Sequence, residues 1–411
     1  MRKLGMVLMA ALMFVSFAYA KNVYDYYNEG IENYRVDEYE KALKLFKKSI
    51  EAKTNYAKAY NMSGLCNVAL KKVDHAIFFY KKAVHTDPEY AEAYFNMGVA
   101  YEEKYARGEE SGEEDGKDED SEDNEKNKEL AVKNYLKAIE LDNDDHIFVR
   151  ASLNLARIYR PLEMYDEAVA VLREGMKKNL IDEVLMAKLY NEAGLVYLAS
   201  TPIVQDDAAF RYAIKFFVTA LYYNQQYVEA ATNLGVAYVR KGLLARGIDQ
   251  FEKALKIDPE FYGLHYEYAN ALLLHGFHEK AESHFLAATM LKPDFAEAFY
   301  GLGKARAKLN KFEEAENALK KSLEIKEDYR LAMNYLLDVR SLRESFRDHI
   351  KFPPKKTGDE FEDDYEDYDE YAEEGEEDRK DEKEKFVEDV EPLRLSELFP
   401  EETEEDEYGE Y

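Results

Sequence analysis

The chain has 411 residues and a formal net charge of −29, with 14% aromatic residues and a single cysteine. Such acidity argues against nucleic-acid binding, because phosphates repel a negatively charged protein. A lone cysteine excludes an intramolecular disulfide framework. The charge is concentrated in two places: residues 357–411 hold 28 acidic and five basic residues, and residues 108–128 hold 11 acidic residues and three lysines.

The chain begins with a pattern typical of a secretory signal peptide. Residues 1–20 combine a basic start at Arg2 and Lys3, an apolar run and the sequence Ala18-Tyr19-Ala20. An uncleaved membrane anchor is the alternative, but the apolar run is short for a bilayer. We therefore expect cleavage after Ala20 and an exported protein, periplasmic or secreted, with no membrane span left after signal removal.

A 34-residue unit organises the sequence that follows. Residues 57–90 place small side chains where two antiparallel helices approach closely, aromatic side chains around that contact, and a proline where the second helix ends. The residues at these positions are Tyr60, Gly64, Ala76, Tyr80, Ala83 and Pro88. One such unit cannot bury its own apolar face, so neighbouring copies are required.

Copies of this unit recur along the chain. Each copy has a small residue and a large apolar one at positions of the repeat, such as Gly30 and Phe46, Gly98 and Tyr101, Ala156 and Leu172, Gly194 and Phe217, Gly235 and Phe251, Ala269 and Phe285, and Gly303 and Leu319. With residues 57–90 they make eight repeats. Residues 330–346 then keep helical spacing of apolar residues, which is typical of a capping helix.

This pattern resembles that of the tetratricopeptide repeat (TPR) family, and the signal peptide suggests an exported bacterial member. The resemblance covers most of residues 22–346. It implies an all-α, right-handed solenoid of about eight helix-turn-helix repeats plus the capping helix.

Two acidic segments depart from the repeat. An insert at 108–128 lies between the two helices of the third repeat, and a tyrosine-rich tail follows at 347–411. Both lack enough apolar residues to offset the entropy of ordering, so we expect them to be disordered. Residues 384–400, EKFVEDVEPLRLSELFP, are more apolar than the rest of the tail and suggest a short segment that folds on a partner or on this protein.

Resemblance to the TPR family also indicates which side chains face the concave groove. It implies that the groove carries aromatic residues first, then basic residues, then a mixture. The residues are Tyr24, Tyr27, Tyr34, Phe95, Arg150, Arg157, Arg160, Lys188, Arg240, Tyr266, Asn270, Tyr300 and Lys304. Arginine and tyrosine combine large contact areas with hydrogen bonds, which suits a peptide ligand. The alternative is that these residues simply coat a solvated helix face.

Position six of the repeat invites a comparison with one TPR subfamily. The repeats of O-linked N-acetylglucosamine transferases carry inward asparagines there, and Asn96, Asn154 and Asn233 are similar. The ladder is broken by other residues at the same position: Met62, Glu192, Glu267 and Gly301. The sequence does not place the chain in this subfamily.

No pattern in the sequence predicts a catalytic or metal site. His265, His275, His278 and His284 cluster in the seventh repeat, but without the i, i+4 spacing that places two ligands on one helical face. Cys66 is expected to be a buried small apolar residue. We therefore expect no catalytic residues, no metal and no cofactor.

Together these features predict a non-catalytic protein-interaction scaffold of a bacterial cell envelope, with a partner peptide in its groove. Self-binding of the acidic tail near Arg150, Arg157 and Arg160 is a further hypothesis, based on opposite charge. The alternative function is an assembly factor for a pilus or secretion machine, acting through the convex face and the acidic segments.

Overall fold

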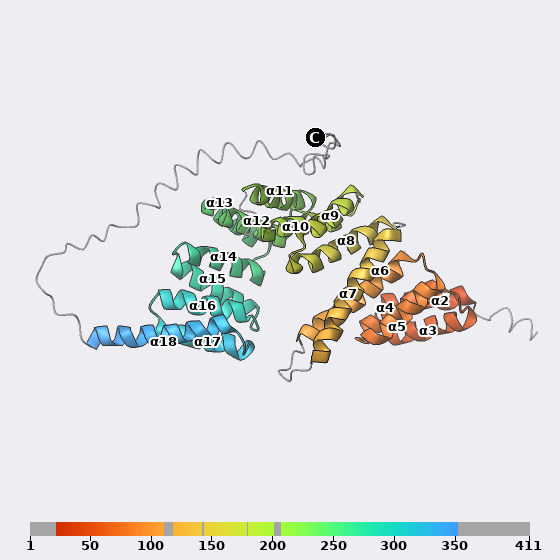
Figure 1. Ribbon diagram of the computed structural model, residues 1–411, viewed down its shortest axis with the longest axis horizontal. Helices are drawn as coiled ribbons and strands as arrows, with labels where there is room; N and C mark the ends of the chain where they lie inside the picture. Colours follow the sequence, from red (N-terminus) through yellow and green to blue (C-terminus); the bar gives the residue numbers. More distant parts are fainter. Residues whose placement is uncertain (1–21, 111–117, 142–143, 179, 201–206, 352–411) are drawn as a thin grey trace, which may run out of the picture. The chain divides into compact units, whose positions relative to one another are not determined.

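The computed structural model describes residues 22–110, 118–141, 144–178, 180–200 and 207–351 (Figure 1). The predicted signal peptide, and the predicted tail from residue 352 onward, lie outside these residues. The chain divides into two compact units, unit 1 up to Leu180 and unit 2 from Ile181.

Unit 1 contains four antiparallel helix pairs, in which the first member is called helix A and the second helix B. They are α2 (Val23–Arg35) with α3 (Tyr39–Ala52), α4 (Ala57–Ala69) with α5 (Val73–Thr86), α6 (Ala91–Glu110) with α7 (Asp118–Leu141), and α8 (Asp145–Tyr159) with α9 (Tyr165–Lys177). A short 3₁₀ helix, η1 (Arg160–Leu162), joins the last two.

Unit 2 contains four further pairs and a terminal helix. They are α10 (Glu183–Ser200) with α11 (Asp207–Tyr223), α12 (Val228–Arg240) with α13 (Leu244–Ile257), α14 (Tyr262–Leu274) with α15 (His278–Leu291), α16 (Ala296–Lys308) with α17 (Phe312–Ile325), and α18 (Arg330–Lys351). The all-α class, the eight helix pairs and the capping helix predicted from the sequence are thus confirmed for the described residues.

The contact between helix A and helix B depends on a glycine facing an aromatic ring. A Cβ atom built on Gly235 would lie 2.6 Å from the ring of Phe251, and one built on Gly98 would lie 2.7 Å from Tyr135. Any larger side chain would force the helices apart. The same arrangement joins Gly30 to Phe46, Gly64 to Tyr80, and Gly194 to Phe217. Aromatic residues of helices B thus fill the space that glycines of helices A leave open.

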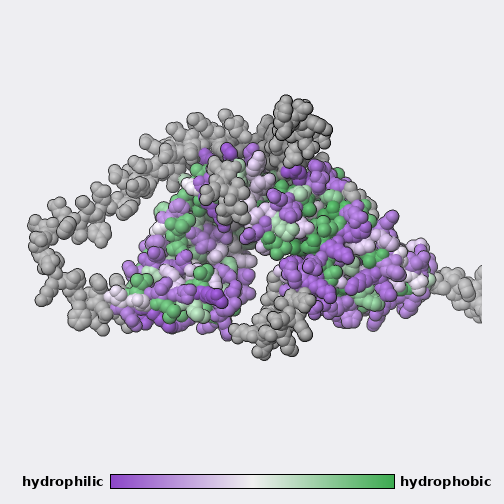
Figure 2. Space-filling model, viewed as in Figure 1, coloured by the Kyte–Doolittle hydropathy of each residue, from purple (hydrophilic) through white to green (hydrophobic). Residues whose placement is uncertain are grey.

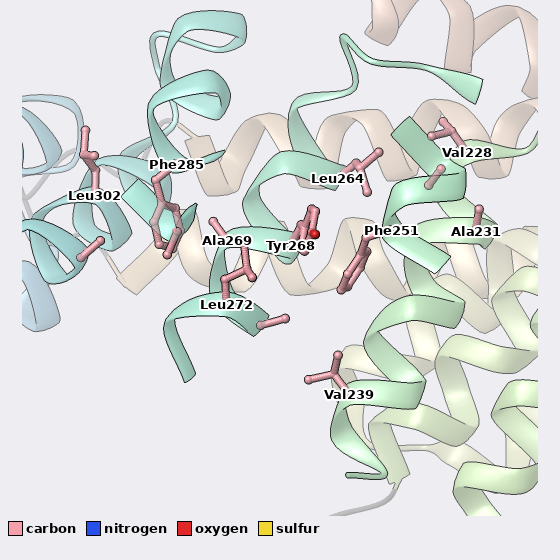
Figure 3. Close-up of a cluster of buried hydrophobic side chains, with 14 of the residues drawn as sticks. Val228, Ala231, Val239, Phe251, Leu264, Tyr268, Ala269, Leu272, Phe285 and Leu302 are labelled. Atoms are coloured by element: carbon pink, nitrogen blue, oxygen red, sulfur yellow. The ribbon is translucent and has the colours of Figure 1, made fainter. Parts of the chain in front are cut away.

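Packing between successive pairs completes the interior. In unit 2, Phe251 from α13 stacks on Tyr268 from α14, with ring centroids 5.1 Å apart. Phe285 from α15 and Leu302 from α16 continue the same buried cluster (Figure 3). Each pair therefore buries its apolar surface against its neighbours, as expected for a repeat fold.

The turn between helix A and helix B is a second repeated feature, and the sequence reasoning missed it. The residue at position 15 of the repeat has a positive φ in six of the described pairs: Asp37, Lys71, Glu163, Gly242, Gly276 and Asn310. A left-handed residue lets the backbone reverse while the last carbonyls of helix A accept hydrogen bonds, as when Lys72 N–H donates to the Asn67 carbonyl at 2.8 Å.

The third pair lacks this tight turn, and here the structure differs from the expected disordered insert at 108–128. Helix α6 runs on to Glu110 and α7 begins at Asp118, so the outer turns of both helices include insert residues. Residues 111–117 lie outside the described part. Lys128 explains part of the order: its ammonium pairs with Glu125 at 2.7 Å and lies 5.6 Å from the Tyr105 ring centroid on α6. Helix pairing therefore extends into a segment whose composition alone favours disorder.

Helix α18 covers one end of unit 2 and continues beyond the predicted boundary at residue 346, to Lys351. Ala332, Leu336 and Val339 are buried in a cluster with residues of α16 and α17. Buried Glu316 on α17 pairs with Arg343 on α18 at 2.7 Å. Apolar contact and an ion pair together fix α18 to the last pair.

Candidate functional site

Helices A of successive pairs lie against one another within each unit and form a continuous surface, called the A-helix face below. In unit 1, α4 contacts α6 and α6 contacts α8; in unit 2, α10, α12, α14, α16 and α18 follow one another in the same way. The residues predicted to bind a partner come largely from these helices.

In unit 1, arginines of α8 lie over polar and aromatic groups of α6. The Arg150 guanidinium lies 4.4 Å from the centroid of the Phe95 ring, within the range of a cation–π contact. Phe95 itself is only 2% exposed, so a ligand would meet Arg150 rather than the ring. Farther along α8, Arg157 attracts the carboxylate of Glu102 and opposes the rise that burial causes in the pKa of that carboxyl.

A tyrosine from helix B connects these two helices A. The Tyr135 hydroxyl donates to the Glu102 carboxylate and accepts a hydrogen bond of 3.0 Å from the Asn154 amide. Burial raises the pKa of Tyr135, so the hydroxyl keeps its proton. The hydrogen bonds hold α6, α7 and α8 in fixed register beneath the arginines.

The N-terminal end of unit 1 is aromatic. Tyr24 is 56% exposed and lies edge-on to Tyr56, with centroids 5.8 Å apart; Tyr27 lies 5.1 Å from the same ring. Burial raises the pKa of Tyr27 to about 12. Tyr34 is half-buried and packs on Tyr39. These tyrosines therefore offer flat rings and neutral hydroxyls to a ligand.

In unit 2 the A-helix face carries a cluster of tyrosines, called the tyrosine cluster: Tyr266 on α14, Tyr300 on α16, Tyr329 before α18, and Tyr335 on α18. Tyr300 lies 5.3 Å from Tyr329 and 6.1 Å from Tyr335, measured between centroids. Tyr266 hydrogen-bonds with Asn270. Burial raises the pKa of Tyr329 to about 12, helped by negative charge at Glu297.

Basic residues edge this cluster. The Lys304 ammonium lies 5.4 Å from the Tyr300 ring centroid, and exposed Arg240 on α12 attracts the carboxyl of Glu267 on α14. Burial raises the pKa of Glu267, and this attraction opposes the rise. The face thus mixes rings, amides and cations over α12, α14 and α16.

Among the predicted site residues, the structure brings together some and leaves others apart. Three groups form: Tyr24 with Tyr27, Arg150 with Phe95, and Tyr266 with Asn270, Tyr300 and Lys304. Arg157 and Lys188 are exposed, whereas Arg160 is half-buried at the start of η1. Units 1 and 2 each carry a separate part of the predicted site.

The asparagines at position six have a structural role that sequence reasoning did not foresee. The Asn96 amide donates to the Asn61 side chain on the preceding helix A at 3.0 Å, and Asn233 donates to Asn191 at 2.9 Å. Both partners stand at position five of the preceding repeat. The sequence does contain a signal for this contact. Asn61 and Asn96 are 35 residues apart, one more than the repeat length of 34, so an asparagine at position five precedes one at position six of the next repeat.

Two of the predicted histidines meet. Nδ1 of His265 lies 3.0 Å from Nδ1 of His284, and Nε2 of His265 lies 2.9 Å from the Pro259 carbonyl. Since that carbonyl only accepts, Nε2 donates to it, and His284 donates to His265. Within the described residues, no group of three or more histidine, cysteine or acidic side chains is close enough to hold a metal ion.

A hollow of about 770 Å³ opens on another surface of unit 1, between α7 and the turn that joins α8 to α9. Its apolar wall includes Leu136, Leu162 and Met164, of which the two leucines are exposed. Lys128 and Glu129 stand at its edge. The long α7 contributes much of this wall, so the insert shapes the hollow.

Comparison with known families agrees with the helix pairing. The profile of the tetratricopeptide repeat matches residues 149–177, 228–261 and 296–329, which correspond to α8/α9, α12/α13 and α16/α17. These three helix pairs of the chain therefore match tetratricopeptide repeats. A profile described as FAT domain matches residues 19–151.

Curated relatives match only in part. A UDP-N-acetylglucosamine–peptide N-acetylglucosaminyltransferase of Giardia intestinalis is 25% identical over 179 residues, which are 40% of this chain and 12% of that protein. An uncharacterized protein, ycf37, of Cyanophora paradoxa is 25% identical over 107 residues, 26% of this chain and 58% of the relative. The chain thus spans less than two thirds of either relative.

Solved structures of human IFIT1 are also similar. The dimer with PPP-AAAA is 16% identical with a TM-score of 0.42, covering 71% of this chain and 69% of IFIT1. A monomeric IFIT1 mutant with Gppp-AAAA is 15% identical with a TM-score of 0.45, covering 74% of this chain and 72% of the mutant.

In the described part of the chain, none of the helices has both the length and the hydropathy that crossing a bilayer requires.

Proposed function

We propose that this TPR protein is a non-catalytic scaffold that holds a peptide segment of another protein on its A-helix faces. The observation that carries the proposal is the arrangement over α6 and α8, where Arg150 and Arg157 stand on a base fixed by Tyr135. Side chains whose supporting residues are already ordered lose little entropy when a ligand binds. Cations on an aromatic and hydrogen-bonded base suit an extended peptide with carboxylates.

The place of action in this proposal is outside the cytoplasm, in a bacterial envelope or in secreted form. It rests on residues 1–20, whose basic start, apolar run and Ala-Tyr-Ala ending are typical of a signal peptide. Removal of the peptide would be measured by N-terminal sequencing of the protein purified from cells. A chain that retains Met1 would contradict export by this route.

The scaffold proposal is tested by capture. The full chain is immobilised and exposed to an extract of the cells that make it, beside Arg157→Glu and a control, Lys44→Glu, at an exposed position on α3. We expect a partner that binds the wild type and the control but not Arg157→Glu. Equal capture by all three would exclude the arginines of α8 from the interface.

An assembly factor that acts through its outer surface is the second candidate. It is favoured by the apolar hollow beside α7, because exposed apolar surface often marks a protein interface. Leu136→Glu alters that wall at an exposed position. Loss of capture by Leu136→Glu, with Arg157→Glu unaffected, would support this candidate over the first.

A further inference from the structure

Helix α18 stands where helix A of a ninth repeat would stand. Arg330 follows Ala296, the first residue of α16, by one repeat length of 34 residues. Like a helix A, α18 packs against the preceding helix B, α17, and against the preceding helix A, α16. Within the described residues, however, no helix B follows it.

Positions 4, 8 and 11 of helix A are covered in every complete pair. The residues at position 8 are all buried: Gly30, Gly64, Gly98, Ala156, Gly194, Gly235, Ala269 and Gly303. Those at positions 4 and 11 are buried or half-buried in all eight pairs. Position 8 faces helix B of the same pair, because Gly98 meets Tyr135 and Gly235 meets Phe251.

The same positions are uncovered in α18. Met333 at position 4 is 47% exposed, Leu337 at position 8 is 58% exposed, and Arg340 at position 11 is exposed. This surface is called the open face. In Figure 2, hydrophobic residues reach the surface in the area where Figure 1 draws α17 and α18.

A solenoid end that meets only water carries a polar outer surface. The open face instead carries methionine and leucine at the two positions that helix B would cover. Leucine at position 8 is also too large for the close approach that glycine permits in the complete pairs. The open face therefore suits an apolar segment that packs farther from the helix axis than helix B does.

We propose that residues 384–400 of the same chain cover the open face. Seven apolar residues of the segment supply the contact: Phe386, Val387, Val390, Leu393, Leu395, Leu398 and Phe399. Five acidic residues against two basic ones make the segment negative. Arg330 and Arg340 are both exposed on α18, and although Arg340 also lies 3.7 Å from Glu316 on α17, the two guanidinium groups offer positive charge to the acidic segment.

The position of the segment in the chain favours it over a separate partner. Only 32 residues, 352–383, separate it from the end of α18. A flexible chain of that length has an average span of roughly 30 Å, similar to the ~33 Å length of a 22-residue helix. Linkage of this kind gives an effective concentration on the order of millimolar, which a free partner rarely reaches.

Disulfide trapping in the full chain tests this inference. In a Cys66→Ser background, cysteines replace Leu337 and Leu395, and oxidation is followed by mass spectrometry at low protein concentration. One control pairs Leu337→Cys with Tyr371→Cys, which the tether brings nearer to α18. A second pairs Leu395→Cys with Asn317→Cys, at an exposed position on α17.

We expect the Leu337 and Leu395 cysteines to form an intramolecular disulfide at least tenfold faster than either control pair. Equal rates in all three would overturn the proposal. A disulfide that forms only between two chains would overturn it too, and would identify a second copy as the occupant of the open face.

Hydrogen exchange gives an independent measurement without new cysteines. Amides of residues 384–400 should exchange at least tenfold more slowly in the wild type than in Leu337→Glu, whose exposed position should leave the fold intact. Unprotected amides in the wild type would contradict the inference. Protection lost in Arg157→Glu but kept in Leu337→Glu would also contradict it, because the segment would then lie on unit 1.

Discussion

Unit 1 and unit 2 have the same kind of interior packing but differ in their A-helix faces. In both units a glycine of helix A meets an aromatic ring of helix B, as at Gly98 with Tyr135 and at Gly235 with Phe251. The face of unit 1 presents arginines on α8 besides the tyrosines of its N-terminal end, whereas the face of unit 2 presents the tyrosine cluster with Arg240 and Lys304 at its edge. The repeat thus constrains the residues that pack and leaves the face free to vary.

This difference separates residues that indicate the fold from residues that can indicate a ligand. Residues at the packing positions report the fold and say little about ligands. Residues on the A-helix faces differ between units of the same fold, so their chemistry is available for recognition. Substitutions of the first kind should act alike in both units, and those of the second kind should act differently.

The largest effect is expected at the packing glycines. Gly98→Ala and Gly235→Ala place a Cβ atom within 3 Å of an aromatic ring, and each should lower the free energy of unfolding by about 1–3 kcal/mol. Urea denaturation followed by circular dichroism measures the change. Glu229→Ala, at an exposed position of α12, is the control and should have little effect. If only one of the two variants were destabilised, the glycine–aromatic contact would not be equivalent in the two units.

A difference between the units appears at acidic pH. Burial lowers the pKa of His284 in unit 2 to about 4, with a smaller contribution from His265, against about 6.5 in an unfolded chain. The unfolded state binds the proton more readily, so stability is present above pH 6.5 and is lost as pH falls toward 4. We expect this loss, about 1–3 kcal/mol, to shrink in His284→Gln. An unchanged pH profile between 4 and 6.5 would contradict the assignment.

The turns at position 15 provide a smaller contrast. Unit 1 places Asp37, Lys71 and Glu163 in the left-handed conformation, whereas unit 2 places two glycines, Gly242 and Gly276, and Asn310 there. A side chain in this conformation costs about 1 kcal/mol, so Lys71→Gly should stabilise the protein and Gly242→Ala should destabilise it, each by about that amount. Chemical denaturation of both variants checks the signs. Changes in the same direction would show that these turns are not equivalent.

The smallest expected effect concerns Cys66. The thiol is buried on α4, and burial raises its pKa to about 12, so little thiolate forms at pH 8. We expect a thiol reagent to react with the native protein at least a hundredfold more slowly than with the protein in urea. Rapid labelling of the native chain would show that α4 opens and exposes the thiol.

The fold could be predicted from sequence to a large extent because packing positions recur at a fixed interval. Gly64 and Tyr80 are 16 residues apart, and the same spacing recurs between Gly30 and Phe46 and between Gly235 and Phe251. Insertions lengthen it to 37 residues between Gly98 and Tyr135 and to 23 residues between Gly194 and Phe217. The insert was harder to predict, since Lys128 is held by Tyr105, a contact that composition does not reveal. The burial of Phe95 under Arg150 likewise depends on how α6 and α8 meet.

The repeat pattern also could not show which side chains remain exposed and which are already hydrogen-bonded. Leu331 and Leu342 keep the apolar spacing predicted for the capping helix, and only their exposure shows that nothing among the described residues covers them. Asn96 matched a ladder of inward asparagines, yet its amide is used by Asn61. Sequence patterns thus located helices better than they located side chains that remain available to a ligand.

The proposed function requires that the A-helix face of unit 1 and that of unit 2 each contribute to binding, through different chemistry. The most direct measurement is the dissociation constant of the captured partner for the full chain, at low and high salt, with Arg150→Ala/Arg157→Ala and with Tyr266→Ala/Tyr300→Ala. We predict that both double variants weaken binding at least tenfold, and that only the arginine variant loses the salt dependence. Unchanged affinity in both variants, with binding lost in Leu136→Glu, would contradict the claim and move the interface to the hollow beside α7.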